Sequence, residues 1–196
     1  PPSLRLRVLR LWSPETPRDR RLERDTFPLV WAAIEEIEPL WRDLMRFYLL
    51  TGCRRREATG LRSADVDFQL GTFTFRDTKN HRDHVLPMTA TLQGILVERV
   101  RAAGRGVLFP VSEPKNITRK LERATGVHIT PHDCRRTFAS VAELAGVGSH
   151  TTSVLLNHKS GSITGTYMGR LDNTALRAAL ERIEVEMLEL ATPFEK

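Results

Sequence analysis

Residues 130–167 read TPHDCRRTFASVAELAGVGSHTTSVLLNHKSGSITGTY, and the rest of the chain is organised around this stretch. Thr130 is a favoured N-cap residue and a proline follows it, which predicts a helix running to about Ala145. Ser149 is expected to cap a shorter helix, at whose end His158 lies. A His-x-x-Arg pair, a second histidine and a lone tyrosine thus accompany short capped helices, and these residue types handle phosphate groups.

His132 and Arg135 are three residues apart, so a helix places them on one face. The N-terminus of that helix offers unpaired N–H groups and the positive end of its dipole, which favour an anion. The same dipole would lower the pKa of the His132 imidazole and favour its neutral, basic form. The alternative is a structural histidine that bonds a loop carbonyl. The pair by itself does not discriminate between these interpretations.

Length and composition narrow the choice of protein class. A chain of 196 residues fits one domain, or one domain with an appended arm. Its formal net charge of +6 favours an anionic partner such as nucleic acid. The sequence lacks a run of about 18 apolar residues and a signal-peptide pattern, so we expect a soluble, intracellular protein that does not enter a membrane. Cys53 and Cys134 are expected to be free thiols.

The two ends of the chain differ from its middle. Residues 1–24 hold seven arginines against three acidic residues and predict a basic linker or arm, with a short strand as the alternative. The chain begins with Pro-Pro and no methionine, so we expect that a preceding DNA-binding domain is missing. Residues 171–196 predict a long helix whose apolar seam is narrow and suited to docking in a groove; the seam comprises Leu176, Leu180, Ile183, Met187 and Leu190.

The residues between these ends predict a mainly α fold with a small antiparallel β-sheet, that is, an α+β domain. Asp25 or Thr26 is expected to cap a helix that ends at Pro39, and an apolar helix follows over residues 40–50, with Gly52 as its stop. A period of two between Val66 and Pro87 indicates the sheet. Further helices are expected over residues 91–102 and 116–125, with these side chains of the first and last helices facing inward: Val30, Ala33, Ile34, Ile37, Ile117, Leu121 and Ala124.

The stretch TGCRRRE, residues 51–57, is a second candidate for chemistry. Gly52 turns the chain, so Arg54 should emerge from a rigid corner, and Glu57 can reach back three residues to hold it. The alternative is that Arg54 and the two arginines after it form a solvated basic turn, as most charge runs do.

Together these motifs resemble those of the tyrosine recombinases, the phage integrase family. TGCRRRE, a hairpin lysine at Lys79, HDCRR, LLNH and a tyrosine nine residues after His158 occur in the family's order, and the resemblance covers about residues 25–190. Cys134 stands where the family's HDLRR motif has leucine, and Asn157 where LLGH has glycine. Neither departure removes a catalytic group, and Cys134 is expected to pack in the core.

The resemblance implies a tyrosine recombinase catalytic-domain fold, with residues 25–170 as the catalytic domain and residues 171–196 docking on a neighbouring protomer. It also implies a role for each matching residue. Arg54 and Arg135 would hold the scissile phosphate, and Tyr167 would be the nucleophile. Lys79 would be the general acid for the leaving 5′-oxygen, His132 the general base, and His158 a second hydrogen-bond donor to the phosphate. The hairpin also offers Arg76, His81, Arg82 and His84 as residues that could face a phosphate.

Physical chemistry supports these roles. Two guanidinium groups can stabilise charge on a phosphodiester without a metal, and a tyrosine with a pKa near 10 needs a base or a cationic field to attack at neutral pH. Of the two tyrosines, Tyr48 lies in an apolar helix and is expected in the core, whereas Tyr167 lies among Gly161, Gly165 and Gly169 in a segment suited to a delivered nucleophile. A metal site would have to come from histidines such as His128 and His132, whose spacing fits no zinc motif, so we expect no metal and no cofactor.

The implied function is that of a site-specific DNA recombinase, an integrase that cleaves and rejoins strands through a 3′-phosphotyrosyl intermediate during integration or excision of a prophage or integrative element. Its expected partners are a double-stranded DNA attachment site, further copies of the protein in a tetramer on DNA, and accessory DNA-bending proteins, in the cytoplasm and associated with the nucleoid. The alternatives are a type IB topoisomerase and a DNA-binding protein of the same fold that has lost its activity.

Overall fold

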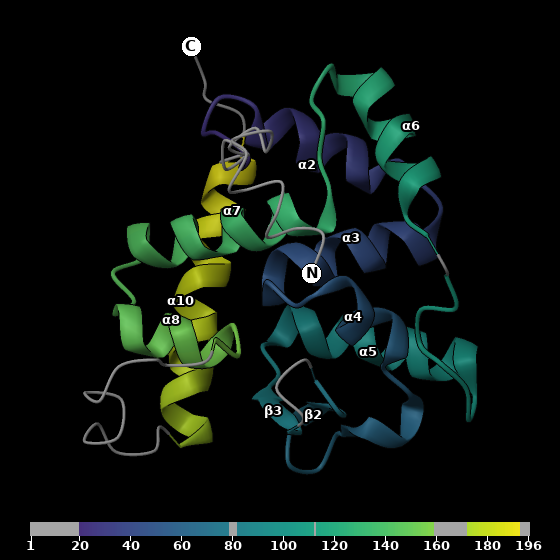
Figure 1. Cartoon of the computed structure of the whole chain (residues 1–196), viewed down its shortest axis with the longest axis vertical. Coiled ribbons are helices and arrows are strands. Elements are labelled where there is room, and N and C mark those ends of the chain that lie inside the picture. The colour runs from purple at the N-terminus through teal and green to yellow at the C-terminus, as the bar shows by residue number, and fades with distance from the viewer. Residues whose placement is uncertain (1–19, 79–81, 112, 159–171, 193–196) are drawn as a thin grey trace, which may run out of the picture.

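The computed structural model describes residues 20–78, 82–111, 113–158 and 172–192 (Figure 1). Lys79, Tyr167, the alternative phosphate contact His81 and most of the predicted basic arm lie outside the described residues.

The described residues form a mainly helical fold with one antiparallel sheet of three strands in the order β1-β2-β3, which confirms the predicted fold class. The helices and strands are α2 (Phe27–Glu35), α3 (Pro39–Thr51), α4 (Arg55–Gly60), β1 (Val66–Asp67), β2 (Thr72–Phe75), β3 (His84–Pro87), α5 (Ala90–Ala103), α6 (Lys115–Thr125), α7 (Pro131–Leu144), α8 (Ser149–Leu155) and α10 (Asn173–Ala191).

Helix α3 is the centre of the fold. It contacts α2, α4, α5, α7 and α10, and its apolar circumference is buried as predicted (Figure 1). Gly52 ends it in the left-handed conformation with φ of 60°. A Cβ atom at Gly52 would lie 2.6 Å from Leu156 and 2.9 Å from Phe138, so only glycine fits here. This tight corner sets the direction in which the chain leaves α3.

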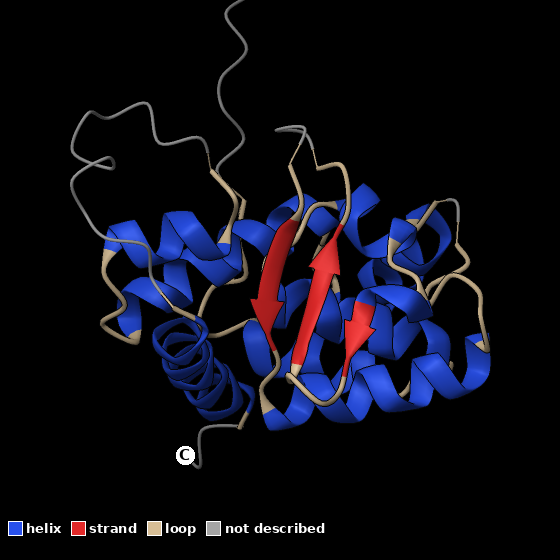
Figure 2. Cartoon of the chain, turned by 90° about the horizontal axis from the view of Figure 1, so that it is seen from below, coloured by secondary structure: helices blue, strands red, loops and turns tan. Residues whose placement is uncertain are grey.

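The sheet packs one face against α3. Phe73 and Phe75 on β2 are buried, and their ring centroids lie 5.5 Å and 6.2 Å from that of Phe47. Phe73 pairs with Leu86 in the antiparallel register of β2 and β3. Figure 2 shows the strands side by side, with α10 seen nearly end-on next to β3. The sheet is therefore held between the central helix and the C-terminal helix.

The apolar seam of α10 lies in a groove of its own chain. All five seam residues are buried, and the helix contacts α2, α3, α7 and β3. Polar contacts add to this packing, since Arg177 donates to the Met88 carbonyl at 2.8 Å and Thr91 donates to Glu184 at 2.6 Å. The groove expected for the seam is thus supplied within the chain. Docking of residues 171–196 on a neighbouring protomer stays a prediction.

Three boundaries and contacts differ from the sequence prediction. Helix α2 ends at Glu35, and Pro39 begins α3 instead of ending α2, because proline lacks the N–H that the first turn leaves unpaired anyway. Gly148 rather than Ser149 is the N-cap of α8. Ala124 is exposed, because the inward face of α6 ends one turn earlier, at Leu121. In the described part of the chain, no helix is both long and apolar enough to cross a bilayer.

Candidate active site

Arg54 is held at the start of α4 by Glu57. The Glu57 carboxylate accepts a hydrogen bond from the Arg54 backbone N–H and another from its guanidinium Nη1, both at 2.7 Å. The Glu57 side chain is only 6% exposed, so this contact fixes the guanidinium rather than tethering it loosely. The predicted reach-back of Glu57 is confirmed. The solvated-turn interpretation suits Arg56, which is exposed, but not Arg54.

Arg135 lies on α7 with its guanidinium buried against backbone carbonyls. Its Nη1 donates to the Gly52 carbonyl at 2.8 Å and its Nη2 to the Leu156 carbonyl at 2.5 Å. Burial, followed by the nearby Arg54 charge, lowers the pKa of Arg135 to about 10, so the side chain stays cationic at neutral pH. No carboxylate in the described part of the chain forms an ion pair with it. Arg54 and Arg135 therefore carry two positive charges, and Glu57 supplies one negative charge beside them.

The C-terminal turn of α8 faces both arginines. The Leu156 carbonyl accepts from Arg135, and the Asn157 carbonyl accepts from Arg54 Nη2 at 3.3 Å. Asn157 has a left-handed backbone with φ of 50°, and the bonds from its N–H to the Val154 carbonyl and from the His158 N–H to the Ser153 carbonyl complete a Schellman cap. The negative end of the helix dipole thus meets the two cations, which eases their mutual repulsion.

His158 and His132 lie at the edge of this cluster, and both side chains are exposed. The pKa of His158 is lowered by partial burial and then by the positive charges of Arg135 and Arg54, because its ring lies within electrostatic range of both. Partial burial and then Arg136 lower the pKa of His132, while Asp133 opposes them. The pKa of His132 is lowered in the predicted direction, but the causes are burial and the charges of Arg136 and Arg135, not the helix dipole.

The start of α7 positions His132 and Arg135 as the sequence predicts. Thr130 accepts a hydrogen bond from the Asp133 N–H at 3.3 Å, and Asp133 accepts one from the Thr130 N–H at 3.0 Å. This reciprocal capping box fixes the first turn of the helix. The structure brings together Arg54, Arg135 and His158, with His132 near them.

Arg76 and His84, two of the hairpin residues that could face a phosphate, differ in their surroundings. Arg76 pairs with Asp65, which precedes β1, at 2.9 Å and with Asp83 of the hairpin at 2.6 Å, so two carboxylates balance its charge. The His84 ring lies near Glu57 and both site arginines, and burial lowers its pKa. A cavity of about 500 Å³ beside Arg54 is lined by Arg54, Arg55, Arg56, Glu57, Arg76, Asp77 and Thr78.

Sequence reasoning missed the polar contacts that tie this cluster together. The Asn157 side-chain amide donates to Thr78 Oγ1 at 2.8 Å, and Gly52 and Leu156 act through their carbonyls. The replacement of glycine by asparagine in LLNH was the available signal for the first contact. Backbone carbonyls carry no side-chain signal, so the other two could not have been found.

The remaining reactive side chains lie in the core. Tyr48 is fully buried, and its burial raises the pKa of its hydroxyl. Burial likewise raises the pKa of the Cys53 thiol to about 12 and that of Cys134 above its ordinary value, and both cysteines are unpaired. The core interpretation of Tyr48 and the packing role of Cys134 are confirmed. Among the described residues, no group of three or more His, Cys, Asp or Glu side chains is placed to hold a metal.

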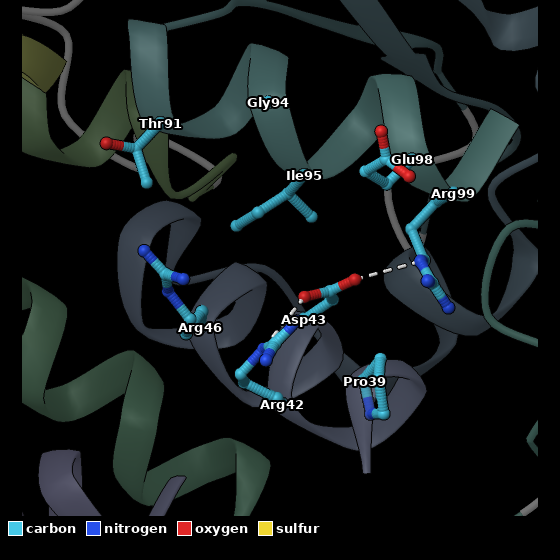
Figure 3. Close-up of a pocket in the computed structure, with 9 residues that line it drawn as sticks. All are labelled: Pro39, Arg42, Asp43, Arg46, Thr91, Gly94, Ile95, Glu98 and Arg99. Carbon is cyan, nitrogen blue, oxygen red and sulfur yellow. Dashed lines mark ion pairs between the residues drawn. The ribbon is translucent and has the colours of Figure 1, made fainter. Parts of the chain in front are cut away.

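A larger cavity of about 620 Å³ between α3 and α5 holds no such cluster (Figure 3). At its base the buried Asp43 pairs with Arg99 at 2.9 Å and with Arg42 at 3.5 Å. Arg46, on the same wall, pairs with Glu35 at 3.5 Å and lies over the Trp31 ring. Each arginine therefore has a carboxylate partner, and the cluster joins α3 to α5.

Comparison with known proteins assigns the family of this chain. The sequence profile described as the phage integrase family matches residues 20–174, which is most of the chain. The chain belongs to the phage integrase family. It is 26% identical to the prophage integrase IntF of Escherichia coli (strain K12), covering 88% of this chain and 40% of IntF. It is 31% identical to the tyrosine recombinase XerA of Pyrococcus furiosus, covering 72% of this chain and 54% of XerA. The chain thus spans about half the length of these relatives.

Solved structures show the same fold at lower identity. The integrase from mycobacterium phage Brujita superposes with a TM-score of 0.66 at 18% identity, covering 94% of this chain and 68% of the other. A lambda integrase tetramer bound to a Holliday junction superposes with a TM-score of 0.55 at 17% identity, covering 79% and 48%. The integrase family resemblance stated from the sequence is confirmed.

Proposed function

We propose that this chain is the catalytic part of a site-specific DNA recombinase, with residues 25–170 as its catalytic domain. The observation that carries the proposal is the pair of cations at Arg54 and Arg135, fixed by Glu57 and by the carbonyls of Gly52, Leu156 and Asn157. Among the described residues, one carboxylate, that of Glu57, pairs with these two guanidinium groups. A phosphodiester bound between them would supply the missing negative charge, and its oxygens would accept hydrogen bonds from their remaining N–H groups.

The proposed reaction uses six residues in the roles that the family resemblance implies. The Tyr167 oxygen attacks phosphorus, and its proton passes to His132. The bond between phosphorus and the 5′-oxygen breaks, and that oxygen takes a proton from Lys79. Arg54, Arg135 and His158 stabilise the charge that builds up on the phosphoryl oxygens. The product is a 3′-phosphotyrosyl ester, which keeps the phosphodiester linkage, so a 5′-hydroxyl from another strand can reverse the reaction without ATP.

The proposed substrate is a double-stranded DNA attachment site of a prophage or integrative element, cut by a tetramer of this protein with accessory DNA-bending proteins. Support for the assembly comes from the lambda integrase tetramer on a Holliday junction, which shares this fold. Support for the nucleophile comes from the burial of Tyr48, because Tyr167 is the other of the two tyrosines in the sequence.

The test is covalent capture. The gene product containing this chain is incubated with nicked duplexes tiled across the DNA that flanks its gene, and adducts that resist SDS are counted. We expect an adduct with the wild-type protein and none with Tyr167→Phe. Sequence-independent relaxation of a supercoiled plasmid would favour a type IB topoisomerase instead. DNA binding without any adduct would favour a DNA-binding protein that has lost its activity.

A further inference from the structure

Asn157 contacts two separate parts of the candidate site. Its carbonyl accepts a hydrogen bond from Arg54 Nη2 at 3.3 Å, and its side-chain Nδ2 donates one to Thr78 Oγ1 at 2.8 Å. Thr78 lies in the β2–β3 hairpin directly before Lys79. One residue therefore touches an arginine of the site on one side and the hairpin on the other.

The hairpin end of this contact is itself well fixed. Thr78 is only 3% exposed, and both its backbone N–H, at 3.3 Å, and its hydroxyl, at 2.9 Å, donate to the Arg82 carbonyl. These bonds join the two limbs of the hairpin at the point that Asn157 reaches. On the returning limb, His84 interacts with the backbone of Val154 in α8. The turn that ends α8 thus contacts the hairpin at the point where its two limbs are joined.

The backbone role of Asn157 does not need its side chain. The left-handed residue of a Schellman cap is usually glycine, and glycine would end α8 with the same two backbone bonds. What asparagine adds is the amide that reaches Thr78. A glycine substitution therefore separates the cap from the link, since it keeps the first and removes the second.

We propose that Asn157 is a positioning residue that couples the β2–β3 hairpin to Arg54. It acts through Thr78 and sets where the proton donor of the hairpin lies relative to the phosphate on the arginines. This inference rests on the proposed function, in which that donor protonates the leaving 5′-oxygen.

The first test does not need catalysis. Amide hydrogen exchange is measured across residues 76–84 in the wild type, in Asn157→Gly and in Asn116→Gly, a matched control at an exposed position on α6. Loss of this partly buried hydrogen bond should speed exchange at Thr78 and along β3 by roughly five-fold in Asn157→Gly and leave it unchanged in the control. Unchanged protection in Asn157→Gly would overturn the coupling, whether or not the protein cleaves DNA.

The second test compares leaving groups. Strand cleavage is timed on a duplex with an ordinary phosphodiester and on one with a 5′-bridging phosphorothiolate, placed where the wild-type adduct maps. Sulfur leaves as a thiolate and needs no proton donor. We expect Asn157→Gly to slow the ordinary substrate about ten-fold and the sulfur substrate less than about two-fold. Thr78→Val removes the bond to Asn157 together with the hydroxyl bond to the Arg82 carbonyl. The Asn157→Gly, Thr78→Val double variant should therefore be no slower than Thr78→Val alone, because the bond that Asn157→Gly breaks is already lost.

Equal slowing of both substrates would mean that Asn157 acts on Arg54 or on the fold, which overturns the proposal. Absence of any adduct with the wild type would count against the proposed function alone, and hydrogen exchange would still decide the coupling.

Discussion

Arg135 and Gly52 are joined by a hydrogen bond of 2.8 Å from the guanidinium to the carbonyl of the left-handed cap of α3. The cap that ends the central helix is therefore also an acceptor for a buried cation of the candidate site. Packing of the core and placement of the charge depend on the same backbone corner.

Substitution of Arg135 by lysine should abolish most cleavage while the fold persists. Arg135 uses two nitrogens to reach the Gly52 and Leu156 carbonyls, and a single ammonium group cannot hold both and a phosphate. We expect the rate of covalent adduct formation to fall at least about 100-fold. Arg136→Lys is the matched control, because Arg136 is half-buried and pairs only loosely with Asp133 at 3.7 Å. Similar rates for both variants would refute a special role for Arg135.

Gly52→Ala should destabilise the protein far more than Gly126→Ala. Both glycines have positive φ, 60° and 72°, so both substitutions carry a backbone cost of about 1 kcal/mol. Only Gly52 has neighbours within contact of a new Cβ, at Leu156 and Phe138, and this overpacking should bring its total to about 3 kcal/mol. The free energies of unfolding in urea measure the difference. Equal losses would show that the corner can open to admit a methyl group.

Asp43→Asn should weaken the junction between α3 and α5. The substitution leaves Arg99, whose side chain is 13% exposed, without its ion-pair partner, and breaking a buried pair costs about 3 kcal/mol. Glu98→Gln in the same cavity is the control, because Glu98 is exposed and its ion pair with Arg101 spans 3.6 Å. Urea denaturation should show a loss for the first variant and almost none for the second. A stable Asp43→Asn protein would show that Arg99 is solvated where it lies.

The acid limb of the cleavage rate should lie below pH 6.5. Partial burial and Arg136 lower the pKa of His132, so the imidazole stays neutral, and able to accept a proton, at pH values where an ordinary histidine with a pKa near 6.5 would be half protonated. The rate should hold its plateau at pH 6.5 and fall only at lower pH, measured with DNA below saturation so that the free protein is reported. His132→Asn should lower the plateau and flatten the limb.

His128→Asn is the control for that profile, since His128 is exposed in the loop after α6 and pairs with Glu122. Its profile should match that of the wild type. A wild-type limb at or above pH 6.5 would contradict a lowered pKa at the base.

Much of the fold was predictable from helix caps and from the periodicity of apolar residues in the sequence. Thr130 caps α7 as predicted, and Phe73 with Phe75 marks the predicted strand, because caps and periodicity depend on near neighbours. The α10 seam shows the limit of such rules. Its spacing predicts a groove but not whose groove, and the structure supplies one from α2, α3, α7 and β3 of the same chain.

The cations of the candidate site and the Glu57 contact that holds Arg54 were predictable from the sequence, whereas the backbone acceptors were not. Arg54, Arg135 and His158 stand out by motif, and the structure brings them together. Their acceptors at Gly52 and Leu156 are carbonyls, which every residue has, so only the folded chain shows which ones are used. Asn157 appeared in the sequence as a departure from a family motif, and its contact with Thr78 required the structure.

The two carbonyls that accept hydrogen bonds from Arg135 belong to Gly52 and Leu156, which are far apart in the sequence. During synthesis, the site arginines leave the ribosome before the turn of α8 that holds them both. A polypeptide that stops short of residue 156 carries both arginines but lacks the Leu156 and Asn157 carbonyls that accept hydrogen bonds from them. The proposed phosphate site is therefore complete only after the turn that ends α8 has been synthesised, and a product that stops before this turn should be unable to cut DNA.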